Sequence, residues 1–203
     1  MIKIKHTEVF GLEHAIRGMR NPLNSWDKSD SFFDGESFIM GENDFALMKK
    51  LAKAGTSHSK YRRMISVYVD INAPLYWWKE FDTYKVGTVA NSCSTMHKLH
   101  AKEFTLNDFS IEHLIGVGSL LAVINEMNFI RNRFNETKDK KYWYHLIQLL
   151  PTSYNQKRTV MLNYEVLANM YKDRKNHKLD EWRDLCNWIE ELPYSEIITG
   201  EQL

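Results

Sequence analysis

The sequence predicts an α+β fold in which helices outnumber strands. Residues 61–72 alternate between apolar and polar side chains, the pattern of a strand with one buried face. The apolar face of that strand consists of Ile65, Val67, Val69 and Ile71. Much of the remaining chain carries apolar residues at intervals of three and four, which indicates amphipathic helices. We find no internal repeat, low-complexity segment or linker, so we predict a single α/β domain over residues 1–203.

Composition excludes several classes of function. The 203 residues include 43% hydrophobic and 26% charged residues, as in an ordinary globular protein able to bury a core. A net charge of +1 gives no global field for nucleic acid or membranes, so we expect neither DNA nor RNA as a partner. No apolar run could span a bilayer and the N-terminus lacks a signal-peptide pattern, so we expect a cytoplasmic protein without a membrane partner. Cys93 and Cys186 form no metal or disulfide framework by spacing.

The first quarter of the chain predicts short elements around a long loop. We expect a strand at residues 2–9, a helix at 12–19, a loop at 20–41, and a helix that ends at Ala54 after a cap by Asn43 or Asp44. The loop is rich in Asn, Ser, Asp and Gly, and a structureless loop of this length is often functional.

The stretch from Ala73 to Lys98 is the centre of the interpretation. Pro74 suits the first turn of a helix, and a short aromatic helix should follow it. The aromatic residues of that helix are Tyr76, Trp77, Trp78 and Phe81. Next comes a run of small hydrogen-bonding residues from Gly87 to Thr95. Such a loop on a rigid helix can hold an anionic ligand, although a polar surface turn explains it equally well.

The second half of the chain predicts mainly helices. We expect a turn at residues 106–109, helices ending near Asn135 and at Leu150, a strand at 159–162, and helices at 163–175 and 179–192. The first of these helices should contain Gly116 and Gly118. Glycine costs roughly 1 kcal/mol against alanine inside a helix, so the two residues suggest a close helix neighbour.

Arg174 is the most informative charged residue. It falls within the apolar arc of its helix, which consists of Val166, Leu167, Met170 and Tyr171. A guanidinium on a buried stripe needs partners. Arg174 therefore either interacts with the free carbonyls and dipole of its helix end, or reaches into a polar pocket to bind an anion or a base edge. Glu165 and Asn169, one turn apart on another side, read as a solvated polar pair.

Two other groups carry weaker signals. His97 and His100 form a basic cluster with Lys98 and Lys102, but no carboxylate is placed to complete a metal site, so we expect no metal. Cys93 lies among hydroxyl residues without a pattern that supports a nucleophile. The catalytic residues stay unassigned.

Several segments together resemble the flavin-dependent thymidylate synthases, also called thymidylate synthase complementing proteins. The family signature R-H-R-x-x-S-x-N-E-x-S-x-R-Y is matched by Asn91 and Ser94 after Ala73-Pro74. A second family segment is matched by Leu150, Pro151, Asn163, Asn169 and Arg174, and a Gly-His-x-Ser element is echoed by Gly55, His58 and Ser59. The resemblance covers most of the chain.

This chain also departs from the family pattern. The arginine-histidine head of the signature is replaced by Thr83, Tyr84, Lys85 and Val86, and later signature positions hold Ser92, Met96 and His97. Arg62-Arg63 replaces a Glu-His pair before the strand. Glu165 stands where the family has an arginine that touches flavin.

The resemblance implies a central antiparallel sheet and a pyrimidine nucleotide methyltransferase that uses FAD and a reduced folate as one-carbon donor. It implies a homotetramer with a pyrimidine deoxynucleotide as ligand. The cofactor-binding residues would be Asn163, Asn169, Tyr84, Lys85 and Val86; the substrate-binding residues would be Arg174, Ser94, Glu80, Ser92 and His97. Two hypotheses follow: a divergent enzyme of this kind, or a catalytically inactive relative that binds a nucleotide or serves in an assembly.

Overall fold

A computed structural model describes residues 1–200, and the chain falls into two units. Unit 1 comprises residues 1–3, 71–83 and 91–159. Unit 2 comprises residues 4–70, 84–90 and the chain from Val160 onward. The single domain over residues 1–203 stays a prediction.

The strands form a four-stranded antiparallel sheet in the order β1-β4-β6-β5. Their bounds are Lys3–Phe10 for β1, Ser66–Pro74 for β4, Val89–Ser92 for β5 and Asn155–Asn163 for β6. The predicted α+β class, the antiparallel sheet and the helix majority are confirmed. Three strand details were wrong: residues 60–64 form a 3₁₀ turn before β4, β5 was expected as loop, and β6 is longer than predicted.

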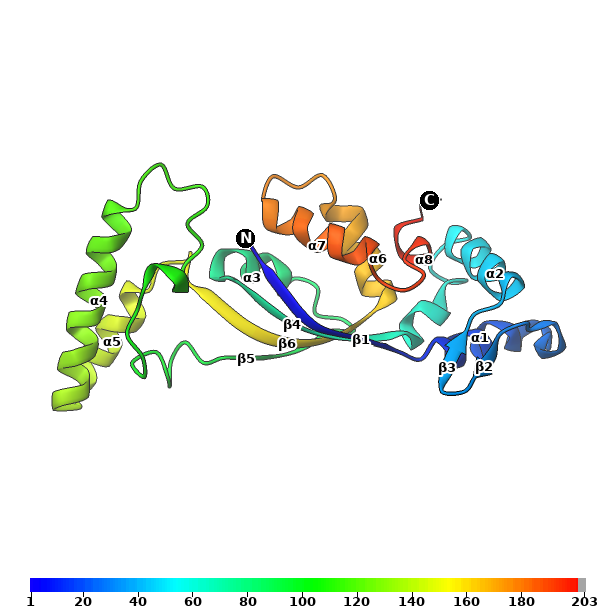
Figure 1. Cartoon of the computed structure of the whole chain (residues 1–203), viewed down its shortest axis with the longest axis horizontal. Helices are drawn as coiled ribbons and strands as arrows, with labels where there is room; N and C mark the ends of the chain where they lie inside the picture. Colours follow the sequence, from blue (N-terminus) through cyan, green and yellow to red (C-terminus); the bar gives the residue numbers. More distant parts are fainter. Residues whose placement is uncertain (201–203) are drawn as a thin grey trace. The chain divides into compact units, whose positions relative to one another are not determined.

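The helices of unit 2 pack on one another: α6 contacts α7 and α8, α2 contacts α8, and α1 contacts α2 (Figure 1). They are α1 Leu12–Arg20, α2 Glu42–Lys53, α6 Tyr164–Arg174, α7 Asp180–Glu190 and α8 Glu196–Thr199. Val67 and Val69 of β4 are buried whereas Tyr68 is exposed, as the alternation predicts. The short helix α8 was not predicted, because Pro193 was taken as the end of the helical region.

The segment expected as a loop over residues 20–41 is ordered around a buried carboxylate. It contains a hairpin of β2 Phe32–Asp34 and β3 Ser37–Ile39. Asp44 was expected as a helix cap, but its fully buried carboxylate accepts hydrogen bonds from Arg20 Nε at 2.6 Å and Ser29 Oγ at 2.6 Å. The cap is instead supplied from a distance, since the Asp30 carboxylate accepts from the backbone N–H groups of Asn43 and Asp44.

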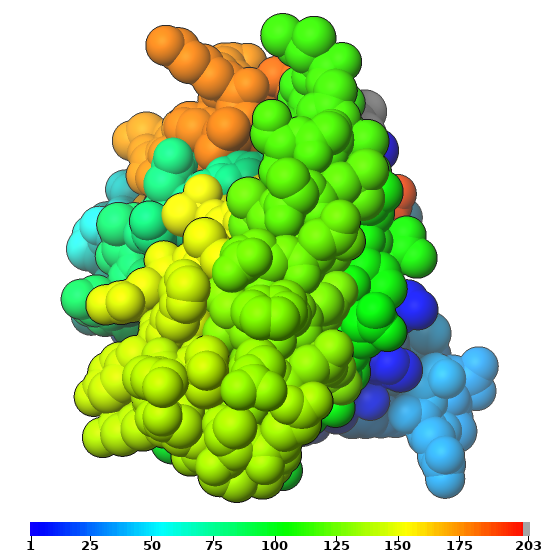
Figure 2. All heavy atoms as spheres, turned by 90° about the vertical axis from the view of Figure 1, so that its left-hand side faces the viewer, coloured from blue at the N-terminus to red at the C-terminus, as the bar shows by residue number. Residues whose placement is uncertain are grey.

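Unit 1 contains α3 Leu75–Phe81, α4 Gly118–Thr137 and α5 Lys140–Leu149. The predicted aromatic helix is confirmed as α3, although Pro74 ends β4 and lies one residue before the helix. Helices α4 and α5 pack side by side on an apolar cluster within this unit (Figure 2). The cluster consists of Leu99, Phe104, Phe109, Ile124, Met127, Ile130 and Leu146.

The glycine expectation for this unit was wrong. Gly116 precedes α4, and Gly118 is its first residue rather than an interior one. A Cβ added at either position would meet no atom within 4 Å, so neither glycine serves the close approach of another helix. Among the described residues, no helix is both long and apolar enough to cross a bilayer.

Candidate functional site

Helix α6 carries the predicted site residues Asn169 and Arg174, and its first turn is fixed by a third, Asn163. This residue ends β6 and caps α6: its side-chain oxygen accepts from the N–H groups of Glu165 and Val166, both at 3.1 Å. The Tyr164 N–H donates to the Ile65 carbonyl at 3.1 Å. This bond ties the start of α6 to the end of the 3₁₀ turn that precedes β4. Asn163 therefore has a structural task whether or not it contacts a ligand.

The loop from Tyr84 to Thr88 approaches the start of α6 closely. Gly87 has φ +80°, a conformation that favours glycine. A Cβ at this position would lie 2.9 Å from Asn163 Nδ2 and 3.1 Å from Val166 Cγ2. The loop that carries the predicted residues Tyr84, Lys85 and Val86 is thus held against α6 by a contact that only glycine permits.

Arg174, at the other end of α6, is surrounded by aromatic rings. Its Nε donates to the Tyr84 hydroxyl at 3.0 Å, and its guanidinium carbon lies 4.6 Å from the centre of the Trp182 ring and 5.6 Å from that of Tyr84. The Tyr84 hydroxyl lies 3.3 Å from Asp173 Oδ2, to which it donates. Burial raises the pKa of Tyr84 although Arg174 opposes this, so the phenol keeps its proton at neutral pH.

Asn169 lies on a different side of α6, in the wall of a cavity of about 320 Å³ within unit 2. The polar and charged residues around it include Thr56, Arg62, Glu165, Lys172 and Lys175. We expected Glu165 to be solvated, and this was wrong. Glu165 is buried, and its Oε2 atom lies 2.8 Å from Arg62 Nε. The Ser59 hydroxyl joins the pair: it accepts from Arg62 Nη2 at 3.0 Å and lies 3.4 Å from Glu165 Oε2.

The other predicted substrate residues belong to unit 1. Ser92 ends β5, and the following turn is closed by Ser94, whose hydroxyl oxygen accepts from the His97 N–H at 2.8 Å. The Cys93 N–H donates to the Lys157 carbonyl, and the Cys93 carbonyl accepts from Gln156 Nε2, so this turn is anchored to β6. Glu80 lies apart on α3.

The structure therefore groups some predicted residues and separates others. Within unit 2 it brings Tyr84 to Arg174 and the neighbouring Gly87 to Asn163, whereas Val86 is 91% exposed and Asn169 lies on another side of α6. Sequence reasoning missed Trp182, which is fully buried beneath the guanidinium. A helix pattern marks Trp182 as a core residue, and no local signal identifies it as a partner of Arg174.

The cavity beside Asn169 has the donor set for part of a dinucleotide. Lys172 and Lys175 supply positive charge, while Thr56 and Asn169 supply neutral donors. These groups fit the diphosphate of FAD. The Glu165 carboxylate in the same wall is neutralised by Arg62 and so repels an anion less than a lone carboxylate would.

The architecture of this chain is similar to that of a flavin-dependent thymidylate synthase and of a UMP/dUMP methylase. The flavin-dependent thymidylate synthase ThyX from Helicobacter pylori, complexed with FAD and dUMP, matches with a TM-score of 0.74 and 18% identity over 98% of both chains. The UMP/dUMP methylase PolB from Streptomyces cacaoi, bound with 5-Br dUMP, matches with a TM-score of 0.70 and 14% identity, covering 98% of this chain and 95% of that one. No protein-family model matches the sequence, and no curated protein matches it. The likeness in structure thus bears out the resemblance, and at identities this low it shows a shared fold alone.

Proposed function

We propose that this protein binds a pyrimidine nucleotide and methylates it with FAD and a reduced folate. The observation that carries the proposal is the fold shared over 98% of the chain with a protein complexed with FAD and dUMP. The cluster around Arg174 adds local support, because a guanidinium can grip a phosphate or the edge of a base through two parallel hydrogen bonds.

The residues of unit 2 would divide the binding between two sides of α6. Arg174 would hold the nucleotide on the side of the Tyr84 loop. Asn169, Thr56, Lys172 and Lys175 would hold the diphosphate of FAD in the cavity on the other side. Bound FAD in its reduced form supplies the hydride for methylation, while the protein supplies binding and orientation.

The Arg62–Glu165 pair favours a second candidate, a nucleotide-binding protein without flavin chemistry. In the resembling family, an arginine that touches flavin occupies the position of Glu165. Here a carboxylate takes that place, and it forms a buried ion pair with Arg62. Loss of a flavin contact without loss of Arg174 would leave nucleotide binding in place of catalysis.

The absorption spectrum of the purified protein after incubation with FAD and gel filtration tests the cofactor. We expect retained flavin absorbance and a higher melting temperature. Incubation with chemically reduced FAD, a one-carbon-loaded reduced folate and dUMP should then yield dTMP. Retained flavin without product would favour an inactive relative. A colourless protein whose melting temperature rises with dUMP but not with FAD would favour the second candidate, and one that responds to neither would contradict both.

A further inference from the structure

A second cavity of unit 2, of about 530 Å³, is lined by α2, α8 and the turn before β4, and we call it the α2–α8 cavity. Helices α2 and α8 contact each other (Figure 1). The charged residues of the cavity wall are Lys49, Lys50, Lys53, Arg62 and Glu196. Binding sites for small organic ligands usually measure about 300–1,000 Å³, so the α2–α8 cavity is large enough for one.

Helix α2 places its three lysines on the face that borders the cavity. Lys53 follows Lys49 by four residues and Lys50 by three, so the three side chains are neighbours on the helix surface. Like charges at these spacings repel each other. The negative end of the helix dipole attracts Lys50 and Lys53, which lie in the last turn, and Lys49 Nζ lies 4.3 Å from the centre of the Phe45 ring. These contacts offset part of the repulsion, and an anion bound between the lysines would remove it.

The wall of the α2–α8 cavity has few negative charges to balance the lysines. Within residues 1–200, the ammonium groups of Lys50 and Lys53 form no ion pair or hydrogen bond. The charge of Arg62 is balanced by Glu165. Among the described residues of the wall, the one remaining carboxylate is that of Glu196. A single carboxylate cannot neutralise three lysines, so the cavity keeps an excess of positive charge.

The excess of positive charge extends along the sequence. Residues 45–69 contain six lysines and arginines and no aspartate or glutamate, whereas the whole chain has a net charge of only +1. Lys60 and Arg63 of this run are exposed on the turn that also carries Arg62. A local concentration of one sign of charge raises the local concentration of counter-ions, whatever the net charge of the chain.

We propose that the α2–α8 cavity is an anion site that binds the phosphate chain of a small molecule through Lys49, Lys50 and Lys53. Each ammonium group is a compact point charge with three donors, which suits the several oxygens of a phosphate chain. The ligand carries at least two negative charges, because one would leave most of the lysine charge unbalanced. This site goes beyond the proposed function, since neither the nucleotide at Arg174 nor the FAD diphosphate beside Asn169 uses the lysines of α2.

Calorimetric titration of the protein with inorganic triphosphate tests the site. The wild-type protein should bind triphosphate at low ionic strength, and added salt should weaken the binding because exposed charges are screened. Lys50→Gln/Lys53→Gln removes two exposed ammonium groups and should keep the melting temperature of the wild type. We expect its triphosphate binding to be about tenfold weaker, because each exposed charge pair contributes a fraction of a decade to about one decade.

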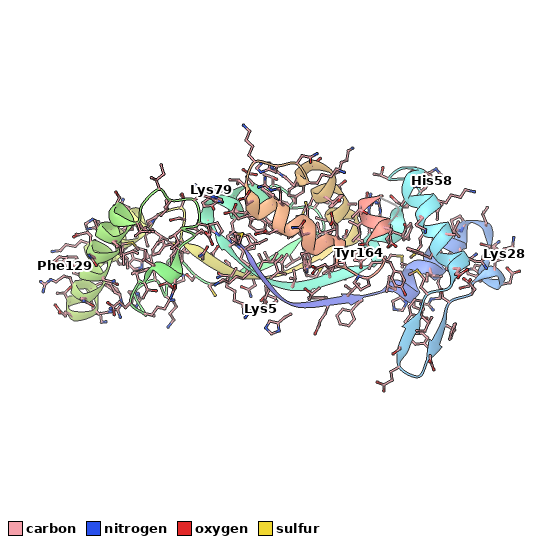
Figure 3. All side chains as sticks on the ribbon, turned by 45° about the horizontal axis from the view of Figure 1, so that its top comes forward. Lys5, Lys28, His58, Lys79, Phe129 and Tyr164 are labelled. Atoms are coloured by element: carbon pink, nitrogen blue, oxygen red, sulfur yellow. The ribbon has the colours of Figure 1, made fainter. Side chains whose placement is uncertain are left out.

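The matched control is Lys5→Gln/Lys178→Gln, which removes the same amount of charge from unit 2. Both residues are exposed and lie outside the wall of the α2–α8 cavity, Lys5 on β1 (Figure 3). The control should bind triphosphate as the wild type does. Lys172→Gln removes a lysine from the cavity beside Asn169 and should also leave triphosphate binding unchanged.

A titration with uridine triphosphate identifies the source of the phosphate chain. Binding tighter than that of inorganic triphosphate would identify a nucleoside polyphosphate as the ligand, and equal binding would identify the phosphate chain alone. In both cases Lys50→Gln/Lys53→Gln should weaken the binding.

Three results would overturn the site. The first is a wild-type protein that binds no triphosphate, and the second is equal triphosphate affinity in the wild type and Lys50→Gln/Lys53→Gln. The third is loss of triphosphate binding in Lys172→Gln alone, which would assign the anion to the cavity beside Asn169. None of these results concerns the binding of dUMP or FAD, so failure of this site and failure of the proposed function are distinguishable.

Discussion

Arg62 and Glu165 form a buried ion pair, with Arg62 Nε 2.8 Å from Glu165 Oε2. Arg62 Nη1 also donates to the Ile197 carbonyl at 3.1 Å. One guanidinium thus joins the turn before β4 to α6 and α8, all within unit 2.

Removing the carboxylate from this pair should destabilise the protein strongly. Glu165→Gln leaves Arg62 as a buried charge without its counter-ion, and breaking a buried pair in this way costs about 3–5 kcal/mol. Chemical denaturation should show that loss in the free energy of unfolding. The double variant Arg62→Met/Glu165→Leu should recover most of it, since apolar residues of similar volume often replace a buried pair at little cost. A wild-type unfolding curve for Glu165→Gln would contradict this account.

Gly87→Ala should be more costly than an ordinary glycine substitution. The new Cβ would meet Asn163 and Val166 at 2.9 and 3.1 Å, in a backbone conformation that side chains rarely adopt. Gly35→Ala is the matched control, because Gly35 also has a positive φ of +60° but no atom within 4 Å of the added Cβ. We expect Gly35→Ala to cost about 1 kcal/mol and Gly87→Ala clearly more, measured by thermal unfolding. Equal losses would show that the contact with α6 is unimportant.

Asp44 should make stability depend on pH at the acid end. Burial by itself raises the pKa of Asp44, but hydrogen bonds from Ser29, Ser31 and Arg20 outweigh burial and hold the pKa below its usual value. The stability that Asp44 contributes is therefore present above the ordinary carboxyl pKa of about 3.9 and is lost as the pH falls through the lower folded value. Asp44→Asn should cost about 3–5 kcal/mol at pH 7, and the difference from wild type should shrink below about pH 4. A difference that stays constant with pH would contradict the role of the charge.

Self-association is a prediction taken from the family resemblance. We expect a dimer or tetramer by light scattering at micromolar concentration. Phe129 is 60% exposed and points outward from α4, the kind of aromatic residue enriched in interface cores (Figure 3). A monomeric mass would contradict the expectation of a shared assembly.

The parts of the fold that depend on local pattern could be predicted from the sequence. The strand β4 was found because burial of one face imposes alternation on Val67, Val69 and Ile71. The aromatic helix α3 was found because its apolar residues are concentrated after a proline. The hairpin within residues 20–41 was missed because its order comes from Asp44, a residue beyond the segment. Polar residues of this segment, whose composition predicts a loop, here donate hydrogen bonds to the one buried carboxylate of Asp44.

The candidate site could be predicted in part, for a similar reason. The spacing of α6 placed Arg174 on the apolar arc, and the structure gives it aromatic neighbours there. The same spacing placed Glu165 on a polar side of the helix, where we expected water to solvate its charge. Its partner Arg62 is distant in sequence, so no periodicity could signal the pair. The roles of Asn163, Asn169 and Arg174 in binding remain predictions.

The central claim is that Arg174 grips a pyrimidine nucleotide, and calorimetric titration of dUMP, dTMP and dCMP into wild type and Arg174→Lys tests it most directly. A lysine keeps the charge near the helix end, worth roughly 0.3–1 kcal/mol, but cannot reproduce two parallel hydrogen bonds or the contact with Trp182. We predict an unchanged fold by circular dichroism and nucleotide binding weakened by roughly tenfold or more, where about 1.4 kcal/mol corresponds to one decade. Equal affinities in the two proteins would contradict the claim and leave Arg174 with a structural role alone.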